Sequence, residues 1–415
     1  MPKPRIMLLT GNPLCSNPRV VKEAAALSEA GYEVRVLGAW SAESGAEADR
    51  HLAAEGGYTF VPLLRPDSCG GRLHRILRSA ARKLAPWSVW SFGLMPSALV
   101  RAARRLNPNL AIAHSEAALF AALALDRGGC KVGVDMEDWF SEDLPLETRR
   151  GRPVAYLKRA ERDLLRCASH ATCTTEVMAD ALVQAYGCRR PTRIYNVFST
   201  APLPAQMEPR DRSPISKSLD GTPSRGRAVR SIHWFSQTIG PGRGLEDLFN
   251  AAEGLPDGIE IHLRGHTGGY GHWLESVLPS TLLNKVFVHG PVPAAQLAAR
   301  IAEHDIGFAG ELSEIPSRDL TATNKIFQYL QGGLAVVASD TAGQKEVAAL
   351  AGAAVVTYRS GSASDLQERL SELNGSAKQL AVAKAAALDI AARSFNWAVE
   401  KPRLLESVRS ALSGK

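Results

Sequence analysis

The sequence lacks several features that would place a protein in a class at once. No apolar run among its 415 residues reaches the roughly 18–20 residues that a membrane-spanning helix needs. The first apolar run, Ile6–Thr10, is also shorter than the roughly 7–15 residues of a signal-peptide core. We therefore expect a buried first strand and a cytoplasmic protein.

Cysteine is scarce, with six scattered residues and no Cys-x-x-Cys pair. This spacing favours neither a disulfide framework nor a thiolate zinc site, so we interpret the cysteines as core or surface residues. His262 and His266 lie in and after one predicted strand without a third candidate ligand, and we expect polar rather than metal-binding roles for them.

Acidic residues in the N-terminal half are too few to balance the bases. Residues 1–200 hold 27 Lys and Arg against 20 Asp and Glu, a net charge of +7, whereas the remaining 22 bases and 22 acids cancel. This half is therefore predicted to meet an anionic surface or ligand. Nucleic acid is disfavoured as the partner, because the bases are not interleaved with stacking aromatic residues.

Apolar strand-sized segments alternate with helical segments, which is typical of parallel sheets covered by helices on both faces. The strands predicted in the N-terminal half are 5–10, 33–37, 110–113, 131–135, 168–174 and 192–196. Those predicted in the C-terminal half are 231–235, 259–263, 286–289, 306–309, 334–338 and 353–357, with helices near 245–253, 293–303, 323–331 and 343–350. We thus predict two α/β domains, as expected for a chain of this length.

The segment between the two sets of strands breaks the pattern. Residues 201–228 carry five prolines and no periodic apolar face, which predicts a linker or a long surface loop. The predicted organisation is therefore an N-terminal domain at 1–200, the linker at 201–228, a C-terminal domain at 229–395 and a final helical segment at 396–415.

The most informative loop follows the first strand of the C-terminal domain. It reads Gly240-Pro241-Gly242-Arg243-Gly244 and directly precedes a predicted helix. Its glycines allow backbone N–H groups to approach a phosphate, the helix N-terminus adds partial positive charge, and Arg243 adds a full one. The loop is neither a Walker loop nor a dinucleotide fingerprint. A plain strand-to-helix connection is the alternative.

A second cation lies in the first turn of the helix predicted at 323–331, where Asn324 and Lys325 stand. A lysine in this turn opposes the helix dipole, which is mildly unfavourable unless an anion is shared there. The alternative is a solvated lysine.

Together these two segments resemble the donor-binding half of family-4-type GT-B glycosyltransferases. The resemblance rests on GPGRGLEDL at 240–248 and NKIFQYLQGGLAVVASD at 324–340. Three N-terminal segments are similar to the same family: SNPRVVKEAAALSEAGYEVRVLG at 16–38, VDMEDWFSED at 134–143 and RIYNVF at 193–198. The resemblance implies an α/β protein of GT-B architecture, with two Rossmann-like parallel-sheet domains facing a central cleft and the final helix crossing back to the N-terminal domain.

The resemblance also implies a function. Such an enzyme moves a sugar from a nucleotide-diphosphate sugar to a saccharide or lipid-linked acceptor, with retention of configuration, in cell-envelope or exopolysaccharide glycan synthesis. Arg243 and Lys325 match the two cations that hold the diphosphate and neutralise it as it leaves. The implied donor-binding residues are Gly240, Gly242, Gly244, Gln237, Asn324, Gln328 at the ribose, Gly290 near the base, and Glu346.

The sequence departs from the family at the donor site. Leu320 and Gln328 replace the common pair of glutamates, and Gln237 stands where a second base is common. Glutamine can still donate and accept at a ribose. These substitutions leave open an unusual donor or an inactive relative.

On the acceptor side, His114 ends a predicted strand and matches a family position near the reacting sugar, which makes it a catalytic candidate beside Arg243 and Lys325. The weaker acceptor-side candidates are Arg19, Glu116, Asp135, Glu137 and Asp138. Asp135, Glu137 and Asp138 could instead cap the next segment. We predict no cofactor besides the donor substrate and no metal, with Glu137-Asp138 as the feature that leaves the metal open.

One segment predicts a membrane contact. Residues 72–84 read as a helix with an apolar stripe flanked by bases, and two tryptophans and a phenylalanine follow within 85–92. Such a helix is typical of peripheral contact with anionic lipid, here through 72–92 at the inner face of a membrane. The alternative is a stripe packed in the domain core.

Three functions remain open at this stage. The first is the transferase, the second a nucleotide-sugar epimerase of the same layout, and the third a non-catalytic binding protein. An epimerase needs paired acids or bases around the sugar ring. The transferase is the leading hypothesis, and Gln328 together with the missing glutamate pair is the feature that speaks for the binding protein.

Overall fold

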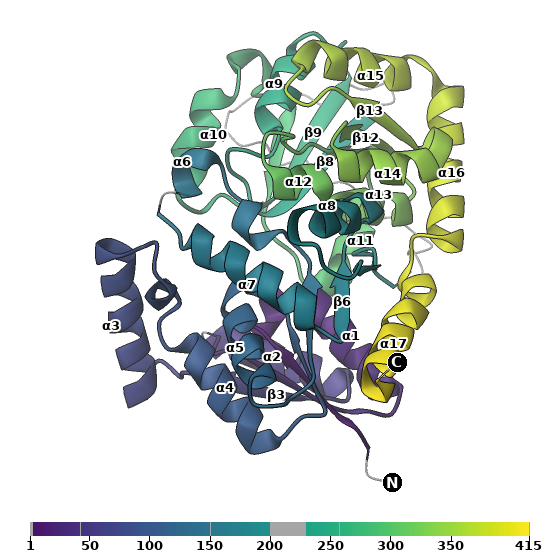
Figure 1. Cartoon of the computed structure of the whole chain (residues 1–415). Helices are drawn as coiled ribbons and strands as arrows, with labels where there is room; N and C mark the ends of the chain where they lie inside the picture. The colour runs from purple at the N-terminus through teal and green to yellow at the C-terminus, as the bar shows by residue number, and fades with distance from the viewer. Residues whose placement is uncertain (1–2, 42, 150, 200–229, 257, 415) are drawn as a thin grey trace. The chain divides into compact units, whose positions relative to one another are not determined.

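The computed structural model describes residues 3–41, 43–149, 151–199, 230–256 and 258–414 (Figure 1). The linker predicted at 201–228 lies outside them. The chain divides into two compact units: unit 1 comprises 1–195, 315–317 and 400–415, and unit 2 comprises 196–314 and 318–399.

Unit 1 is built on a parallel sheet of seven strands in the order β3-β2-β1-β4-β5-β6-β7. Its strands are β1 Arg5–Leu9, β2 Glu33–Ala39, β3 Thr59–Leu63, β4 Leu110–Ala113, β5 Val132–Met136, β6 His170–Cys173 and β7 Thr192–Arg193. Its helices are α1 Pro18–Glu29, α2 Glu43–Glu55, α3 Cys69–Leu84, α4 Met95–Leu106, α5 Glu116–Asp126, α6 Leu146–Arg149, α7 Val154–Cys167 and α8 Glu176–Tyr186.

Unit 2 is built on a parallel sheet of six strands in the order β10-β9-β8-β11-β12-β13. Its strands are β8 Arg230–Thr238, β9 Ile259–His266, β10 Val286–His289, β11 Ile306–Ala309, β12 Ala335–Ser339 and β13 Val355–Tyr358. Its helices are α9 Leu245–Glu253, α10 Gly271–Val277, α11 Ala294–Ala302, α13 Asn324–Gln331, α14 Ala342–Ala351, α15 Ala363–Gly375 and α16 Ala377–Arg393, with α12 Pro316–Leu320 at the unit boundary.

The predicted α/β class with two parallel sheets is therefore confirmed. β4, β10 and β11 have the predicted bounds, and the central strands are buried along their whole length. Such strands read as continuous apolar runs because helices cover both faces of the sheet.

Strand β3 was not predicted from the sequence. This strand contains Pro62, which has no backbone N–H to donate to a sheet. The structure places β3 at the sheet edge, where it pairs with β2 alone. An edge strand tolerates proline because its outward N–H groups need no partner strand.

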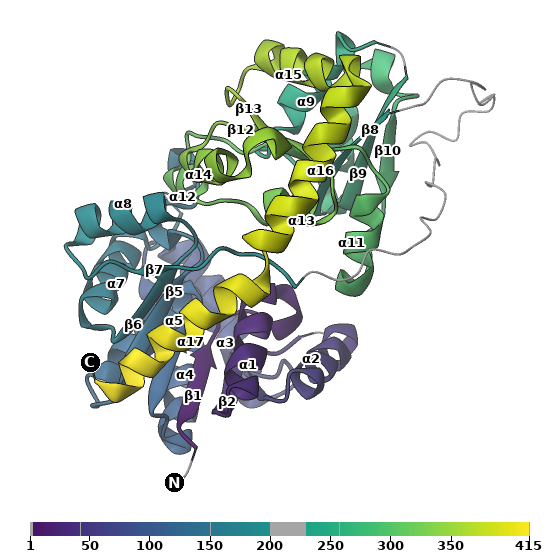
Figure 2. The same ribbon diagram turned by 90° about the vertical axis from the view of Figure 1, so that its right-hand side faces the viewer.

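Helix α17 (Trp397–Ser413) begins in unit 2 and belongs to unit 1 from Glu400 onward (Figure 2). Glu400 pairs with Arg193, and the Lys131 ammonium donates to the carbonyl oxygens of Ala411 and Leu412 at 2.9 and 2.8 Å. These bonds satisfy C-terminal carbonyls that a helix cannot satisfy itself.

Each sheet has one point at which its connections diverge. In unit 1 this point lies between β1 and β4, and in unit 2 it lies between β8 and β11. Open parallel sheets bind ligands beyond the carboxyl ends of the strands at such points. The loops that follow β1, β4, β8 and β11 are therefore the places to look for a site.

None of the described helices has the length and apolar character needed to cross a bilayer. All six cysteines are free, with Cys173 and Cys188 buried.

Candidate functional site

The glycine loop of unit 2 connects β8 to α9 and has a backbone that needs glycine. Gly242 and Gly244 have φ angles of +75° and +73°, which L side chains rarely adopt. A Cβ atom on Gly244 would lie 3.2 Å from Cα of Gly310, which follows β11. The loop therefore packs against the backbone at the end of β11, on the other side of the divergence point.

Two side chains hold this loop in place. The Arg318 guanidinium donates to the carbonyl oxygen of Gly242 at 2.5 Å. Tyr270 ends the short 3-10 helix Gly268–Tyr270 that follows β9. Its ring lies over Gly240, and a Cβ atom on Gly240 would come within 2.9 Å of that ring. Arg318 thus fixes the loop and adds a positive charge beside Arg243.

Lys325 lies in the first turn of α13 and is buried. Its ammonium is 2.6 Å from a carboxylate oxygen of Glu311, which is also buried, and it lies 5.8 Å from the centre of the Trp234 ring. Lys325 is therefore not the solvated lysine of the alternative interpretation.

The charges of this group influence one another. Burial by itself raises the pKa of Glu311, but Lys325, Arg243 and Arg318 bring that pKa below its ordinary value. Burial lowers the pKa of Lys325, and Arg243 lowers it further, against the opposing effect of Glu311. Three cations and one carboxylate thus share the divergence point of unit 2.

Several buried polar atoms around this group make no hydrogen bond among the described residues. They are Oγ1 of Thr323, Oε1 of Gln328, Oγ1 of Thr341 and Oε1 of Gln344. A buried polar atom without a partner costs about 1–3 kcal/mol, so native proteins rarely keep one without a reason. A polar ligand at the starts of α13 and α14 would supply partners.

The other predicted donor-side residues follow carboxyl ends of the same sheet. Gln237 is exposed in β8, and Gly290 is exposed after β10, where its carbonyl oxygen accepts from Arg264 at 3.2 Å. Asn324 in α13 and Glu346 in α14 are half-buried. The structure shows their positions and leaves their roles as predictions.

The divergence point of unit 1 holds a second, fully buried group of charges. Arg19, in the first turn of α1, donates twice to the Asp135 carboxylate, at 2.5 and 2.8 Å, and once to the carbonyl oxygen of Ile194 at 3.0 Å. Thr172 donates to Asp135 at 2.7 Å. Asn17 caps α1 by accepting from the Val20 N–H, which sets the turn that carries Arg19.

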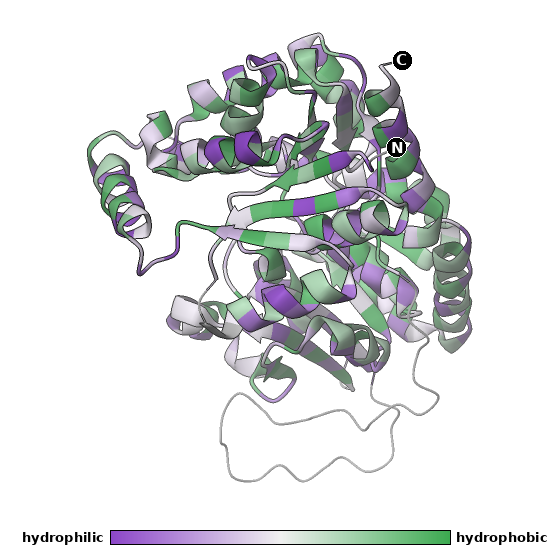
Figure 3. Cartoon of the chain, turned by 90° about the horizontal axis from the view of Figure 1, so that it is seen from below, coloured by the Kyte–Doolittle hydropathy of each residue, from purple (hydrophilic) through white to green (hydrophobic). Residues whose placement is uncertain are grey.

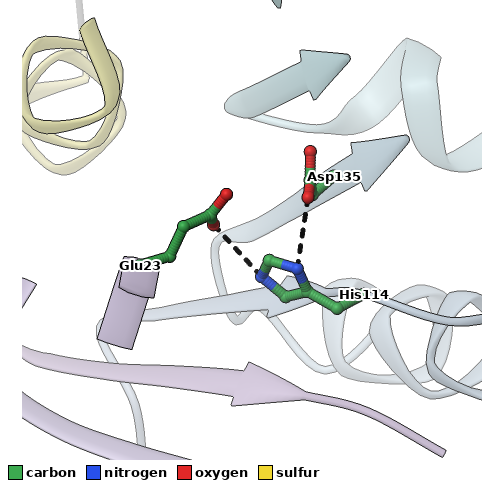
Figure 4. Close-up of side chains that lie close together, drawn as sticks. All are labelled: Glu23, His114 and Asp135. Carbon is green, nitrogen blue, oxygen red and sulfur yellow. Dashed lines mark ion pairs between the residues drawn. The ribbon is translucent and has the colours of Figure 1, made fainter. Parts of the chain in front are cut away.

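His114 lies between two carboxylates in this group (Figure 4). Its Nδ1 is 3.3 Å from Asp135, its Nε2 is 3.6 Å from Glu23, and none of the three side chains is exposed. Burial lowers the pKa of His114, but Asp135 and Glu23 more than offset this, and the pKa lies above its ordinary value. Burial and the neighbouring Asp135 raise the pKa of Glu23 to about 7.

Glu23, His114 and Asp135 form the one group in the described part of the chain whose ligand atoms, all within 4.8 Å of one another, could hold a metal ion. Arg19 already occupies Asp135 with two hydrogen bonds and lies 3.3 Å from Glu23. Its guanidinium supplies the positive charge that an ion would bring. The arrangement therefore fits an arginine-centred network better than a metal site.

The remaining acceptor-side candidates lie after the carboxyl ends of β4 and β5. Glu116 forms an ion pair with Arg152. Glu137 and Asp138 follow β5 and are half-buried, and burial together with Asp135 raises the pKa of Glu137 above its ordinary value, against the opposing effect of Arg19.

His262 and His266, for which we expected polar rather than metal-binding roles, lie in different environments. His262 is buried, and its Nδ1 lies 2.9 Å from Nε2 of His289. His266 is exposed at the end of β9. Neither belongs to the metal-capable group.

Glu311, Arg318 and Glu23 were not predicted from the sequence as site residues. Glu311 stands two residues after a buried strand, the position at which ligand-binding side chains are sought in parallel sheets. Glu23 stands one helical turn after Arg19, a spacing that places both on one helix face. Arg318 had no local signal, because its partner Gly242 is distant in sequence.

Helix α3 carries the apolar stripe predicted for membrane contact. Leu73, Ile76 and Leu84 are 49%, 65% and 78% exposed, and Trp87 and Trp90 beyond the helix are also exposed. The helix appears at the left edge of Figure 3 with apolar and polar residues side by side. The alternative of a stripe packed in the core is therefore wrong for these residues.

Comparison with known proteins gives the family context. Residues 19–201 match Glycosyltransferase Family 4. No curated protein sequence matches the chain.

Solved structures match the chain over nearly its whole length. Sucrose-phosphate synthase from Thermosynechococcus elongatus has a TM-score of 0.72 at 11% identity, covering 100% of both chains. Anabaena Alr3699/HepE in complex with UDP-glucose has a TM-score of 0.69 at 16% identity, covering 98% of this chain and 99% of the other. A candidate UDP-N-acetylglucosamine 2-epimerase from Listeria monocytogenes has a TM-score of 0.59 at 11% identity, covering 100% of this chain and 98% of the other. The chain thus has the two-sheet GT-B fold of these solved structures, and its residues 19–201 match Glycosyltransferase Family 4.

Proposed function

We propose that this protein is a glycosyltransferase that moves a sugar from a nucleotide-diphosphate donor to a saccharide or lipid-linked acceptor. The observation that carries the proposal is the grouping of Arg243, Lys325 and Arg318 at the divergence point of unit 2. With Glu311 they bring a net charge of about +2 to the start of α9 and α13, which suits a diphosphate.

The chemistry follows from this charge. Breaking the anomeric C–O bond leaves an oxocarbenium-like sugar and a diphosphate that gains negative charge. Fixed cations at that diphosphate lower the barrier, each by about 3 kcal/mol where water is excluded. The proposal assigns this role to Arg243 and Lys325. Gln328, whose Oε1 is buried without a hydrogen bond among described residues, is assigned to the donor ribose.

Retention of configuration and a role for His114 are part of the proposal by family resemblance alone. The structure holds the imidazole between Glu23 and Asp135, where the carboxylates favour its charged form. An imidazolium there would add positive charge beside the acceptor-side residues of unit 1.

The first test is binding of the donor. A thermal-shift screen uses UDP, GDP, ADP, dTDP and their sugars with the wild-type protein and with Arg243→Ala and Lys325→Ala. We expect one diphosphate to raise the melting temperature, and each substitution to weaken its binding at least about tenfold, since each removes a charge-assisted bond. Lys378→Ala, at an exposed lysine of α16, is the matched control and should bind like the wild type. Equal stabilisation of both variants and the wild type would remove the site assignment.

The second test separates the open functions. A transferase consumes the nucleotide sugar only when an acceptor sugar is present, and it releases the nucleoside diphosphate. An epimerase, which the Listeria structure brings into consideration, would instead produce an epimeric nucleotide sugar without acceptor. A protein that binds the diphosphate and turns over nothing with a panel of saccharide and lipid-linked acceptors would be the non-catalytic alternative.

The exposed stripe of α3 adds a membrane to the proposal. The helix contains Arg72, Arg75, Arg78, Arg82 and Lys83 and no acidic residue. The segment after it folds back so that the Leu94 N–H donates to Nδ1 of His74 at 3.0 Å, which turns the His74 side of the helix inward and leaves the stripe outside. Bases beside an exposed Leu, Ile and Trp surface suit a helix lying on anionic lipid. A lipid-linked acceptor at the inner face of a membrane follows from this contact.

Vesicle sedimentation tests this contact. We expect the wild-type protein to sediment with phosphatidylglycerol vesicles, less so at high salt, and far less with pure phosphatidylcholine. Ile76→Glu should weaken sedimentation about tenfold or more, because it places a carboxylate in the apolar surface. Leu350→Glu, at a residue 56% exposed on α14 of unit 2, is the control. Equal loss in both variants, or binding indifferent to lipid charge, would exclude α3 as the contact.

A further inference from the structure

Glu311 places a negative charge inside the group proposed to bind a diphosphate. Coulomb repulsion between a carboxylate and a phosphate is unfavourable, and it is stronger where water is excluded. Glu311 is 4% exposed. A carboxylate in this position therefore needs a physical reason.

The backbone of Glu311 is held on both sides. Its N–H donates to Oγ of Ser339 at 2.9 Å, and Ser339 in turn accepts from the Gln344 amide at 2.7 Å. Its carbonyl oxygen accepts from Oγ of Ser360 at 3.0 Å. These contacts come from β12, α14 and the turn after β13. The fold therefore fixes the backbone position from which the Glu311 carboxylate extends.

The Glu311 carboxylate pairs with Lys325, a buried lysine whose ammonium needs an opposite charge nearby. Lys325 is buried near the positive charges of Arg243 and Arg318, and its ammonium lies 5.8 Å from the centre of the Trp234 ring. A buried ammonium near like charges loses its proton readily unless an opposite charge stabilises it. Glu311, 2.6 Å from the ammonium, is that opposite charge.

We infer that Glu311 is a positioning residue of the donor site, which keeps Lys325 protonated and orients its ammonium toward the diphosphate. One of the three ammonium N–H donors goes to Glu311, and the others remain for phosphate oxygens. This inference rests on the proposed function, since it concerns how the same site binds its donor.

The inference predicts a pH dependence of donor affinity that structural damage alone would not produce. Replacement of Glu311 by glutamine removes the charge that stabilises the ammonium, so Lys325 should lose its proton at a lower pH than in the wild type. As pH rises, the donor affinity of Glu311→Gln should therefore begin to fall at a lower pH than that of the wild type. At low pH, where Lys325 is protonated in both proteins, the variant should bind as tightly as the wild type or more tightly, because a repulsive carboxylate is gone.

The experiment is calorimetric titration with UDP and with inorganic pyrophosphate at pH 6.5, 7.5, 8.5 and 9.5. The ratio of the variant's Kd to the wild-type Kd cancels the ionisation of the probe. We expect this ratio to be about 1 or lower at pH 6.5 and to rise by up to about tenfold for each pH unit once Lys325 deprotonates.

Two further variants complete the design. Glu311→Gln combined with Lys325→Arg should restore a ratio that does not change with pH, since a guanidinium stays charged throughout. Glu314→Gln removes an exposed carboxylate from the same loop and should follow the wild type. Thermal melting of each variant without ligand shows whether it is folded.

The outcomes separate the two proposals. Failure of the wild type to bind pyrophosphate, UDP and every other nucleoside diphosphate of the thermal-shift screen at any pH would overturn the proposed function. A wild type that binds, with a Glu311→Gln ratio that stays constant across the pH range, would overturn the positioning role alone. A constant ratio above 1 would indicate structural damage, and a constant ratio below 1 would indicate simple repulsion.

Discussion

At the scale of residues, the two sites solve the same electrostatic problem in different ways. In unit 1 a buried guanidinium is surrounded by two carboxylates and an imidazole, and in unit 2 a buried carboxylate is surrounded by three cations. Buried charges persist only when they are paired and hydrogen-bonded. In the group of unit 1 the positive and negative charges nearly cancel. The group of unit 2 keeps an excess of positive charge, as a site for an anion requires.

Glu23 makes one residue-scale prediction possible. Its pKa in the folded protein is about 7, against an ordinary value near 4.5. Between these values the folded state binds one more proton at Glu23 than the unfolded state does. The contribution of Glu23 to the free energy of unfolding therefore falls as pH rises through this window, by about 1.4 kcal/mol per pH unit.

The variant Glu23→Gln cannot ionise and should lose this dependence. We expect its free energy of unfolding, relative to the wild type, to rise between pH 4.5 and pH 7 and to level off above that. Urea unfolding at several pH values measures the difference. Glu47→Gln, at an exposed glutamate of α2, is the control and should show no such trend. A relative stability of Glu23→Gln that is flat across the window would contradict the raised pKa.

At the scale of elements, the proposed phosphate binding by unit 2 depends on the connection between β8 and α9. Gly244 combines a positive φ with backbone contact to Gly310, so an added methyl group meets both strain and a neighbour. We expect Gly244→Ala to lower stability by about 1–3 kcal/mol and to weaken diphosphate binding.

Thermal melting and UDP titration measure both effects. Gly269→Ala is the matched control, since Gly269 has ordinary backbone angles and open space around its Cβ position. Wild-type melting and binding by Gly244→Ala would show that the loop adapts and that its glycines are not required.

Helix α3 and strand β3 show how differently elements can be predicted. The stripe of α3 is visible in sequence because helical periodicity repeats over sixteen residues. Its exposure was not visible, because periodicity is the same for a stripe on the core and for a stripe in solvent. β3 was hidden by Pro62, whose tolerance depends on the strand's place at the sheet edge.

At the scale of the whole molecule, the chain forms two parallel-sheet units, and unit 1 is discontinuous in sequence. Residues 315–317 and 400–415 belong to unit 1 although they come after most of unit 2 in sequence. The net charge of +7 lies in residues 1–200, which contain α3 and the acceptor-side candidates. A basic half carrying a helix with an exposed apolar stripe is consistent with the proposed anionic lipid surface.

The sequence alone determined the class of fold, the approximate positions of the described strands other than β3, the glycine loop and the candidacy of the two cations Arg243 and Lys325. These follow from local rules: apolar periodicity, glycine at turns, and charge at helix starts. Each of these signals lies within a short stretch of sequence, so it can be recognised without the tertiary structure.

Only the tertiary structure decided which charges meet. Arg19 and Asp135 are 116 residues apart, and Arg318 reaches Gly242 across 76 residues. Even Lys325 and Glu311, 14 residues apart, meet only because α13 and the end of β11 pack together. Strand order sets these meetings, and strand order depends on how whole helices cover the sheet, which no short stretch of sequence specifies.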